Sequence, residues 1–138
     1  YNYTIITMNY LQTIHSNFRW ILLLSGSVAI ITYSVTLLKV IAYSKLNRRI
    51  GLLFVISMDL QATIGLILIS ANTFYIGVSY TMNALPHAIT MFLAIISAHL
   101  ASRWSKLANK TMYSLIATII SLLFILAGIR EMTGNWIF

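Results

Sequence analysis

The chain has 138 residues, of which 59% are hydrophobic and only 8% charged, and its formal net charge is +7. Soluble domains carry roughly 25% charged residues, so this composition excludes an ordinary water-facing surface. The basic residues cluster in two short segments between apolar runs, which favours lipid headgroups over nucleic acid as the partner of the positive charge. The absence of cysteine excludes disulfides, iron–sulfur ligation and covalently attached c-type haem.

Four apolar segments are long enough to cross a bilayer, which takes about 20 mostly apolar residues. In chain order they cover residues 18–38, 50–72, 87–104 and 112–129. We therefore expect an all-α membrane protein in which residues 1–138 form one transmembrane domain, an up-down bundle of four helices. The uncharged segment 73–86 is expected to be a long loop. Pro86 is expected to start the third helix, where its missing N–H costs nothing.

The charges between the spans predict the orientation of the bundle. The basic residues of these connections are Lys39, Lys45, Arg48, Arg49, Arg103, Lys106 and Lys110. Because basic residues stay on the cytoplasmic side, both basic connections are expected inside, and both termini and segment 73–86 outside. Trp20, Tyr75, Tyr80 and Trp136 are expected near the outer interface, which amphipathic rings prefer.

Small and hydroxyl residues recur at helical spacing in every span, as expected of faces that pack against other helices. These faces comprise Ser25, Ala29, Thr32 and Thr36; Ser57, Gln61 and Gly65; Thr90, Ala94, Ser97 and Ala101; and Ser114, Ala117, Ser121 and Gly128. The same spacing extends the first face to His15 and the third to His87. Packing alone accounts for the small residues, but two histidines on inward faces near the outer end need a further explanation.

Neutral imidazole is the usual axial ligand of non-covalently bound haem, so His15 and His87 are candidate ligands of the iron of a haem b. Arg19 and Arg130 are candidates to pair with its propionates. The alternative is that both histidines are interfacial residues bonded to backbone or headgroups. Counted from the basic residues at the inner ends of their helices, the two histidines differ in depth by roughly 12 Å, which argues against a shared ligand.

Asp59, Gln61 and His99 are further polar residues inside the spans, and ionisable groups in hydrocarbon, such as Asp59 and His99, are functional candidates by default. Asp59 and His99 are expected in the inner half of the membrane, close enough to pair. They could form part of a proton path or only a satisfied structural pair. Glu131 is expected in a solvated pair with its neighbour Arg130. We find no nucleophile–base triad and no phosphate-binding glycine loop, so we do not expect a free-standing enzyme.

Short motifs along nearly the whole chain resemble a known family. Residues 15–20 read His-Ser-Asn-Phe-Arg-Trp, residues 45–49 read Lys-Leu-Asn-Arg-Arg, and Leu-Gln at 60–61 precedes Ile-Gly-Leu-Ile-Leu at 64–68. His87 is followed by Met91 and Ala94. These segments resemble the H-S-x-x-R-W opening, the K-L-D-R turn, the L-Q-x-x-x-G-L-I-L span and the E-H-x-x-x-M-x-x-A start of small four-span membrane proteins of Bacteroidota, often labelled cytochrome b-like.

The chain departs from that pattern at two positions. Pro86 stands where the family usually has glutamate, and Asp59 stands where it often has histidine, so a haem ligand at that second position would be lost. The resemblance implies a bacterial inner-membrane protein linked to respiratory electron transport, either a b-type cytochrome-like protein or a haem-carrying subunit. The alternative is a cofactor-free accessory subunit packed against a larger membrane complex. A third reading is a small proton or solute carrier using Asp59 and His99. The expected partners are the lipid bilayer and other membrane subunits, not nucleic acid.

Overall fold

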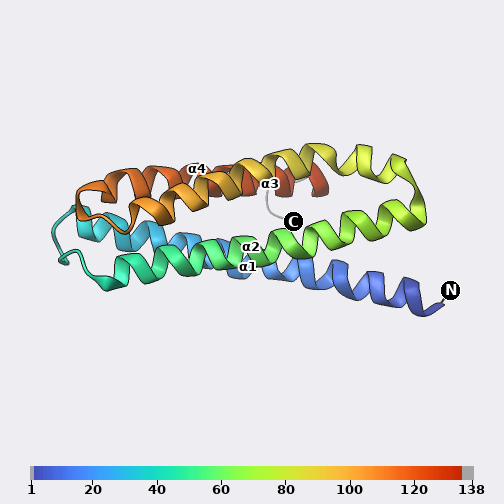
Figure 1. Cartoon of the computed structure of the whole chain (residues 1–138), viewed down its shortest axis with the longest axis horizontal. Coiled ribbons are helices and arrows are strands. Elements are labelled where there is room, and N and C mark those ends of the chain that lie inside the picture. The colour runs from blue at the N-terminus through green and yellow to red at the C-terminus, as the bar shows by residue number, and fades with distance from the viewer. Residues whose placement is uncertain (1, 135–138) are drawn as a thin grey trace.

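The computed structural model describes residues 2–134, with side-chain environments for residues 7–132 and 134. This part of the chain is all helical and contains no strand, as the sequence predicted. Trp136, expected at the outer interface, lies outside the described residues. The helices are α1 (Asn2–Leu37), α2 (Lys45–Ile76), α3 (Val78–Trp104), the short 3-10 helix η1 (Ala108–Lys110) and α4 (Thr111–Thr133) (Figure 1).

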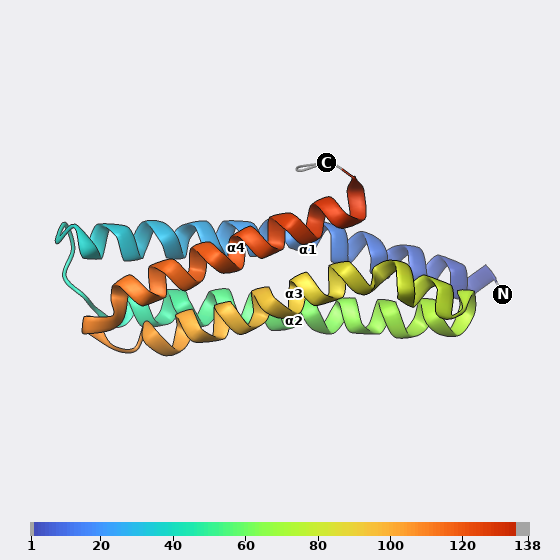
Figure 2. The same ribbon diagram turned by 90° about the horizontal axis from the view of Figure 1, so that it is seen from above.

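The four long helices run up and down in one bundle (Figures 1 and 2). Helices adjacent in sequence pack together, and α1 also packs against α4, which closes the bundle. We call the end that carries the α2–α3 connection the outer end, and the end that carries residues 38–44 and 105–110 the inner end. All four helices are long and apolar enough to cross a membrane, judged by length and composition.

The prediction of a long loop over residues 73–86 was wrong. Helix α2 continues to Ile76 and α3 begins at Val78, so only Gly77 separates them. Gly77 has a φ of 106°, a conformation that glycine adopts without the clash a Cβ would cause. The Thr73 and Thr81 hydroxyls hydrogen-bond to each other across this turn. Uncharged residues can continue a helix past the bilayer, so polarity alone did not locate the break.

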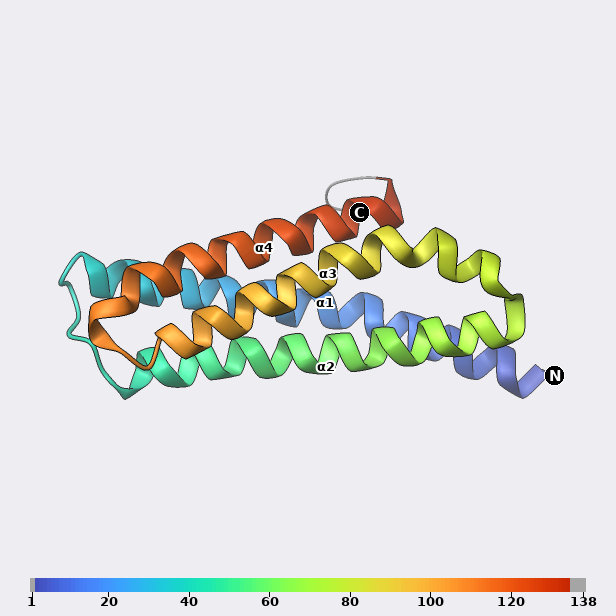
Figure 3. The same ribbon diagram turned by 45° about the horizontal axis from the view of Figure 1, so that its top comes forward.

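Pro86 lies inside α3 rather than at its start, contrary to the sequence prediction. Proline has no N–H to donate to the carbonyl of the preceding turn, and its ring crowds that carbonyl, so helices bend at such positions. In Figure 3 the axis of α3 changes direction in its outer third. Pro86 therefore separates a straight inner part of α3 from a short outer part that leads back to the Gly77 turn.

The start of α2 is set by a capping box, and residues 45–49, expected in a loop, form its first turn. The Ser44 hydroxyl accepts a hydrogen bond from the Leu46 N–H, and the Asn47 side-chain oxygen accepts one from the Ser44 N–H. Such reciprocal bonds satisfy N–H groups that have no partner within the helix. The Asn47 amide also donates to Thr36 Oγ1 over 2.8 Å, which ties the inner ends of α1 and α2 together.

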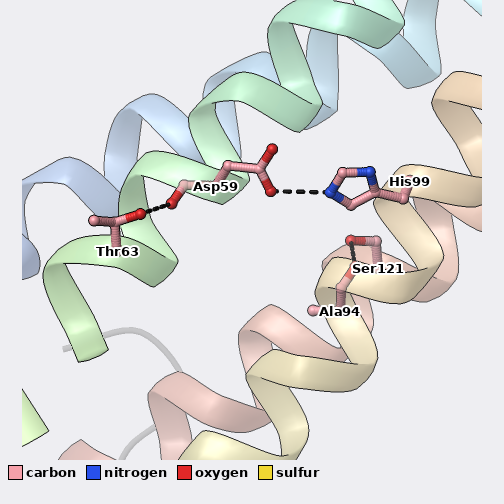
Figure 4. A network of polar contacts seen from close by, with 5 residues as sticks. All are labelled: Asp59, Thr63, Ala94, His99 and Ser121. Carbon is pink, nitrogen blue, oxygen red and sulfur yellow. Dashed lines mark hydrogen bonds and ion pairs between the residues drawn. The ribbon is translucent and has the colours of Figure 1, made fainter.

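The inward faces predicted from small residues are confirmed at their central positions. Ala29, Ala94 and Ser121 are fully buried. The Ser121 hydroxyl donates to the Ala94 carbonyl oxygen over 2.8 Å and so joins α4 to α3 (Figure 4). The larger residues of the core are Leu22, Phe54, Val55, Met58, Ile125 and Ile129.

The orientation of the bundle in a membrane stays a prediction with a direct test. The chain has no cysteine of its own, so single cysteines can report on each end. Asn83 is exposed near the outer end and Asn109 is exposed in η1 at the inner end. We expect an impermeant maleimide to label Asn83→Cys in intact cells, and Asn109→Cys only after permeabilisation. Labelling of Asn109→Cys from outside would reverse the predicted topology.

Candidate functional site

A cavity of about 210 Å³ lies among all four helices in the outer half of the bundle. Its inner walls are apolar side chains, including Leu22, Leu68 and Ile125. The polar residues that line it are Gln12, His15, Ser16, Arg19, Gln61, Tyr80 and His87. Gln12 and Ser16 are exposed, so the cavity is open on that side. An apolar cavity with a few converging polar groups is the usual form of a ligand site.

His15 and His87 meet in this cavity, although they come from α1 and α3, which lie diagonally across the bundle. Their ring centroids are 6.4 Å apart and their planes are inclined by 80°. The predicted difference of roughly 12 Å in depth between His15 and His87 was therefore wrong. Figures 2 and 3 show that α1 extends further toward the inner end than α3 does. Counting residues from the two inner ends therefore exaggerated the separation.

The His87 ring is oriented by α4. Its Nδ1 lies 2.8 Å from the carbonyl oxygen of Gly128. A carbonyl can only accept, so Nδ1 carries the proton and Nε2 of the neutral ring keeps a lone pair. A Cβ at position 128 would stand 3.2 Å from this Nδ1 and 3.1 Å from Met91 Sδ. Gly128 therefore allows the close approach of α3 and α4 that this bond requires.

The His15 ring lies against α2. The Gln61 amide nitrogen donates to the His15 carbonyl oxygen over 3.0 Å and lies 3.4 Å from His15 Nε2. Among the described residues, Gln61 Oε1 and His15 Nδ1 are buried without a hydrogen-bond partner. Each such atom costs roughly 1–3 kcal/mol, so the pair points to a ligand or water. Sequence reasoning placed Gln61 on an inward face, four residues from Gly65, but did not predict its contact with His15.

Of the two arginines predicted to pair with propionates, Arg19 borders the cavity. Its Nε is buried without a partner, and its guanidinium carbon lies 5.4 Å from the centre of the Trp20 ring. Arg130 is exposed near the end of α4, and the cavity lining does not include it. Glu131, expected beside Arg130, accepts a 2.7 Å hydrogen bond from the Thr90 hydroxyl of α3.

The predicted pairing of Asp59 with His99 is confirmed. His99 Nε2 lies 2.9 Å from Asp59 Oδ1 and joins α3 to α2 (Figure 4). The side chains are 51% and 54% exposed, so the pair lies on the outside of the bundle and not in the cavity. Thr63 donates its hydroxyl proton to the Asp59 carbonyl oxygen and leaves the carboxylate to His99. The Asp59–His99 pair is therefore separate from the His15–His87 site.

A double-mutant cycle should detect this contact between Asp59 and His99. We expect Asp59→Asn and His99→Gln to be non-additive in thermal unfolding in detergent, with a coupling of about 0.6 kcal/mol, the average for hydrogen bonds in membrane bundles. Losing one partner should destabilise more than losing both, because it leaves an uncompensated polar group. As a control, His99→Gln combined with the distant Thr36→Ala should be additive. Strict additivity of the first pair would contradict the contact.

Among the described residues, no group of three or more His, Cys, Asp or Glu side chains could hold a metal ion. The described chain is thus a four-helix bundle, apolar enough to cross a membrane four times, with a two-histidine cavity in its outer half. No family model matches the chain, and no curated protein or solved structure matches it either.

Proposed function

We propose that this chain is a b-type cytochrome-like protein of the bacterial inner membrane, holding haem b between His15 and His87 as a subunit of a respiratory electron-transport complex. The observation that supports this most directly is the 6.4 Å separation of the two ring centroids. Metal–imidazole bonds are about 2 Å long and the ring centre lies about 1 Å behind the nitrogen, so two imidazoles that would hold one ion have ring centres up to about 6 Å apart.

The residues around the two histidines suit this role. The Gly128 carbonyl fixes the tautomer and orientation of His87, which is the usual second interaction of a ligating histidine. The Gln61 contact with His15 Nε2 is 3.4 Å long, which is longer than a typical hydrogen bond, so it would compete only weakly for that nitrogen. Arg19 brings a cation one helical turn from His15, where it can pair with a carboxylate. A haem iron bound there would supply reversible one-electron transfer.

The size of the cavity is the observation that favours the second candidate function, a cofactor-free subunit packed against a larger membrane complex. A cavity of 210 Å³ has the volume of about seven waters at ~30 Å³ each. A porphyrin is larger, so its binding would require side chains at the open side of the cavity, near Gln12 and Ser16, to move aside while the two histidine rings keep their spacing. A protein that never takes up haem would keep the cavity as described.

The absorption spectrum of the purified protein distinguishes the two candidates. After expression with a haem supply, we expect a b-type reduced-minus-oxidised spectrum and one haem per chain by pyridine haemochrome assay. Circular dichroism would confirm that the protein is folded. A folded protein that stays colourless, even after titration with haemin, would reject the haem proposal and leave the cofactor-free subunit.

A further inference from the structure

A second hollow lies on the outside of the bundle, between α2 and α3 toward the inner end. This groove is a shallow, open hollow of about 720 Å³ and does not share residues with the two-histidine cavity. Its walls are apolar, with Leu52 and Val55 on α2 facing Ile96 and Leu100 on α3. An apolar groove on the surface of a membrane-spanning bundle offers a fixed position for a hydrocarbon chain.

The inner mouth of this groove is positively charged. His99, Arg103 and Lys106 line it. His99 and Arg103 are four residues apart and so share one face of α3, and Lys106 follows in the turn after the helix ends at Trp104. Arg48, one helical turn before Leu52 on α2, is outside the groove lining. Of the two acidic residues of the chain, Asp59 is bonded to His99 deeper in the membrane. The other, Glu131, lies near the outer end of α4.

We propose that the groove binds a phospholipid with an anionic headgroup, with an acyl chain along the apolar walls and the phosphate at Arg103 and Lys106. Basic pockets between membrane helices on the cytoplasmic side recognise anionic lipids in this way. A second copy of the chain fits less well. A two-fold interface would place the Arg103 and Lys106 of one copy against those of the other, and like charges repel.

This occupant also accounts for the position of the Asp59–His99 pair. His99 lines the groove one helical turn deeper than Arg103, and its side chain is 54% exposed in the absence of a lipid. A lipid seated with its phosphate at Arg103 would bring its glycerol esters to the level of His99. The half-exposed pair would then contact polar ester groups instead of hydrocarbon.

Native mass spectrometry from nanodiscs that contain equal phosphatidylglycerol and phosphatidylcholine tests the proposal. We expect the wild-type chain to retain phosphatidylglycerol preferentially. The variant Arg103→Gln/Lys106→Gln should lose about 30-fold in this relative affinity, as expected for two cations near a lipid headgroup. The matched control Lys39→Gln/Lys110→Gln removes the same charge outside the groove lining and should retain the preference.

A second variant fills the groove and keeps its charges. Ile96→Trp should displace the retained lipid, whereas Ile120→Trp, at an exposed position of α4, should not. Equal retention of the two lipids by the wild-type chain, or an unchanged preference in both groove variants, would overturn the proposal. A dimer of the chain that Ile96→Trp dissociates would overturn it as well, because a second copy would then cover the groove.

Discussion

Replacing His87 by alanine is expected to abolish the b-type reduced-minus-oxidised spectrum while the protein still folds and inserts. The structure brings His87 and His15 together from opposite helices, so both imidazoles would hold the haem, and the loss of either should weaken its binding. Loss of partners that only orient a metal ligand typically costs 10–100-fold in affinity, so loss of the ligand itself should cost at least about 100-fold. The same result is expected for His15→Ala, measured by haemin titration.

The third histidine of the chain provides a matched control. His99 lies on the outside of the bundle, bonded to Asp59, so His99→Ala should keep the spectrum. Gln61→Leu removes only the amide beside His15 and should shift the midpoint potential or the line shape without removing haem. An unchanged spectrum in His87→Ala would rule out the assignment of the ligands, whether or not haem is bound elsewhere.

Replacing Gly51 by valine is expected to destabilise the bundle strongly. A Cβ at this position would stand 2.6 Å from Ser105 Oγ and 2.6 Å from the Tyr33 hydroxyl oxygen. Both residues are 1% exposed and have little room to move. Overpacking of this kind costs about 1–3 kcal/mol, and the additional methyl groups of valine should bring the loss to the upper part of that range. Thermal unfolding in detergent would measure it.

Two comparisons separate this clash from the general cost of valine in a helix. Leu53→Val, at an exposed position two residues away, should change stability by less than about 1 kcal/mol. In a Gly51→Ala background, adding Tyr33→Phe and Ser105→Ala removes both oxygens from the path of the new Cβ and should recover part of the lost stability. A Gly51→Val protein as stable as the wild type would contradict the packing of α1, α2 and the α3–α4 connection described above.

Composition and periodicity determined much of this protein without a structure. The shortage of charge predicted a membrane environment, and four apolar runs predicted four helices. The spacing of small residues predicted the inward faces, because a helical period repeats locally and does not depend on its neighbours. The Asp59–His99 contact could also be predicted, since consecutive antiparallel helices pack side by side and both residues were expected at similar depth.

Only the tertiary structure revealed the contacts that depend on how the helices are staggered and rotated relative to one another. The stagger of α1 relative to α3 brings the ring centroids of His15 and His87 to within 6.4 Å of each other. Counting residues along one helix cannot predict that stagger. The bond of His87 to Gly128 requires the close approach of α3 and α4. The outward position of the Asp59–His99 pair depends on how α2 and α3 are rotated in the bundle. Helix stagger and rotation come from packing among all four helices together, which is why residue spacing within each helix could not supply them.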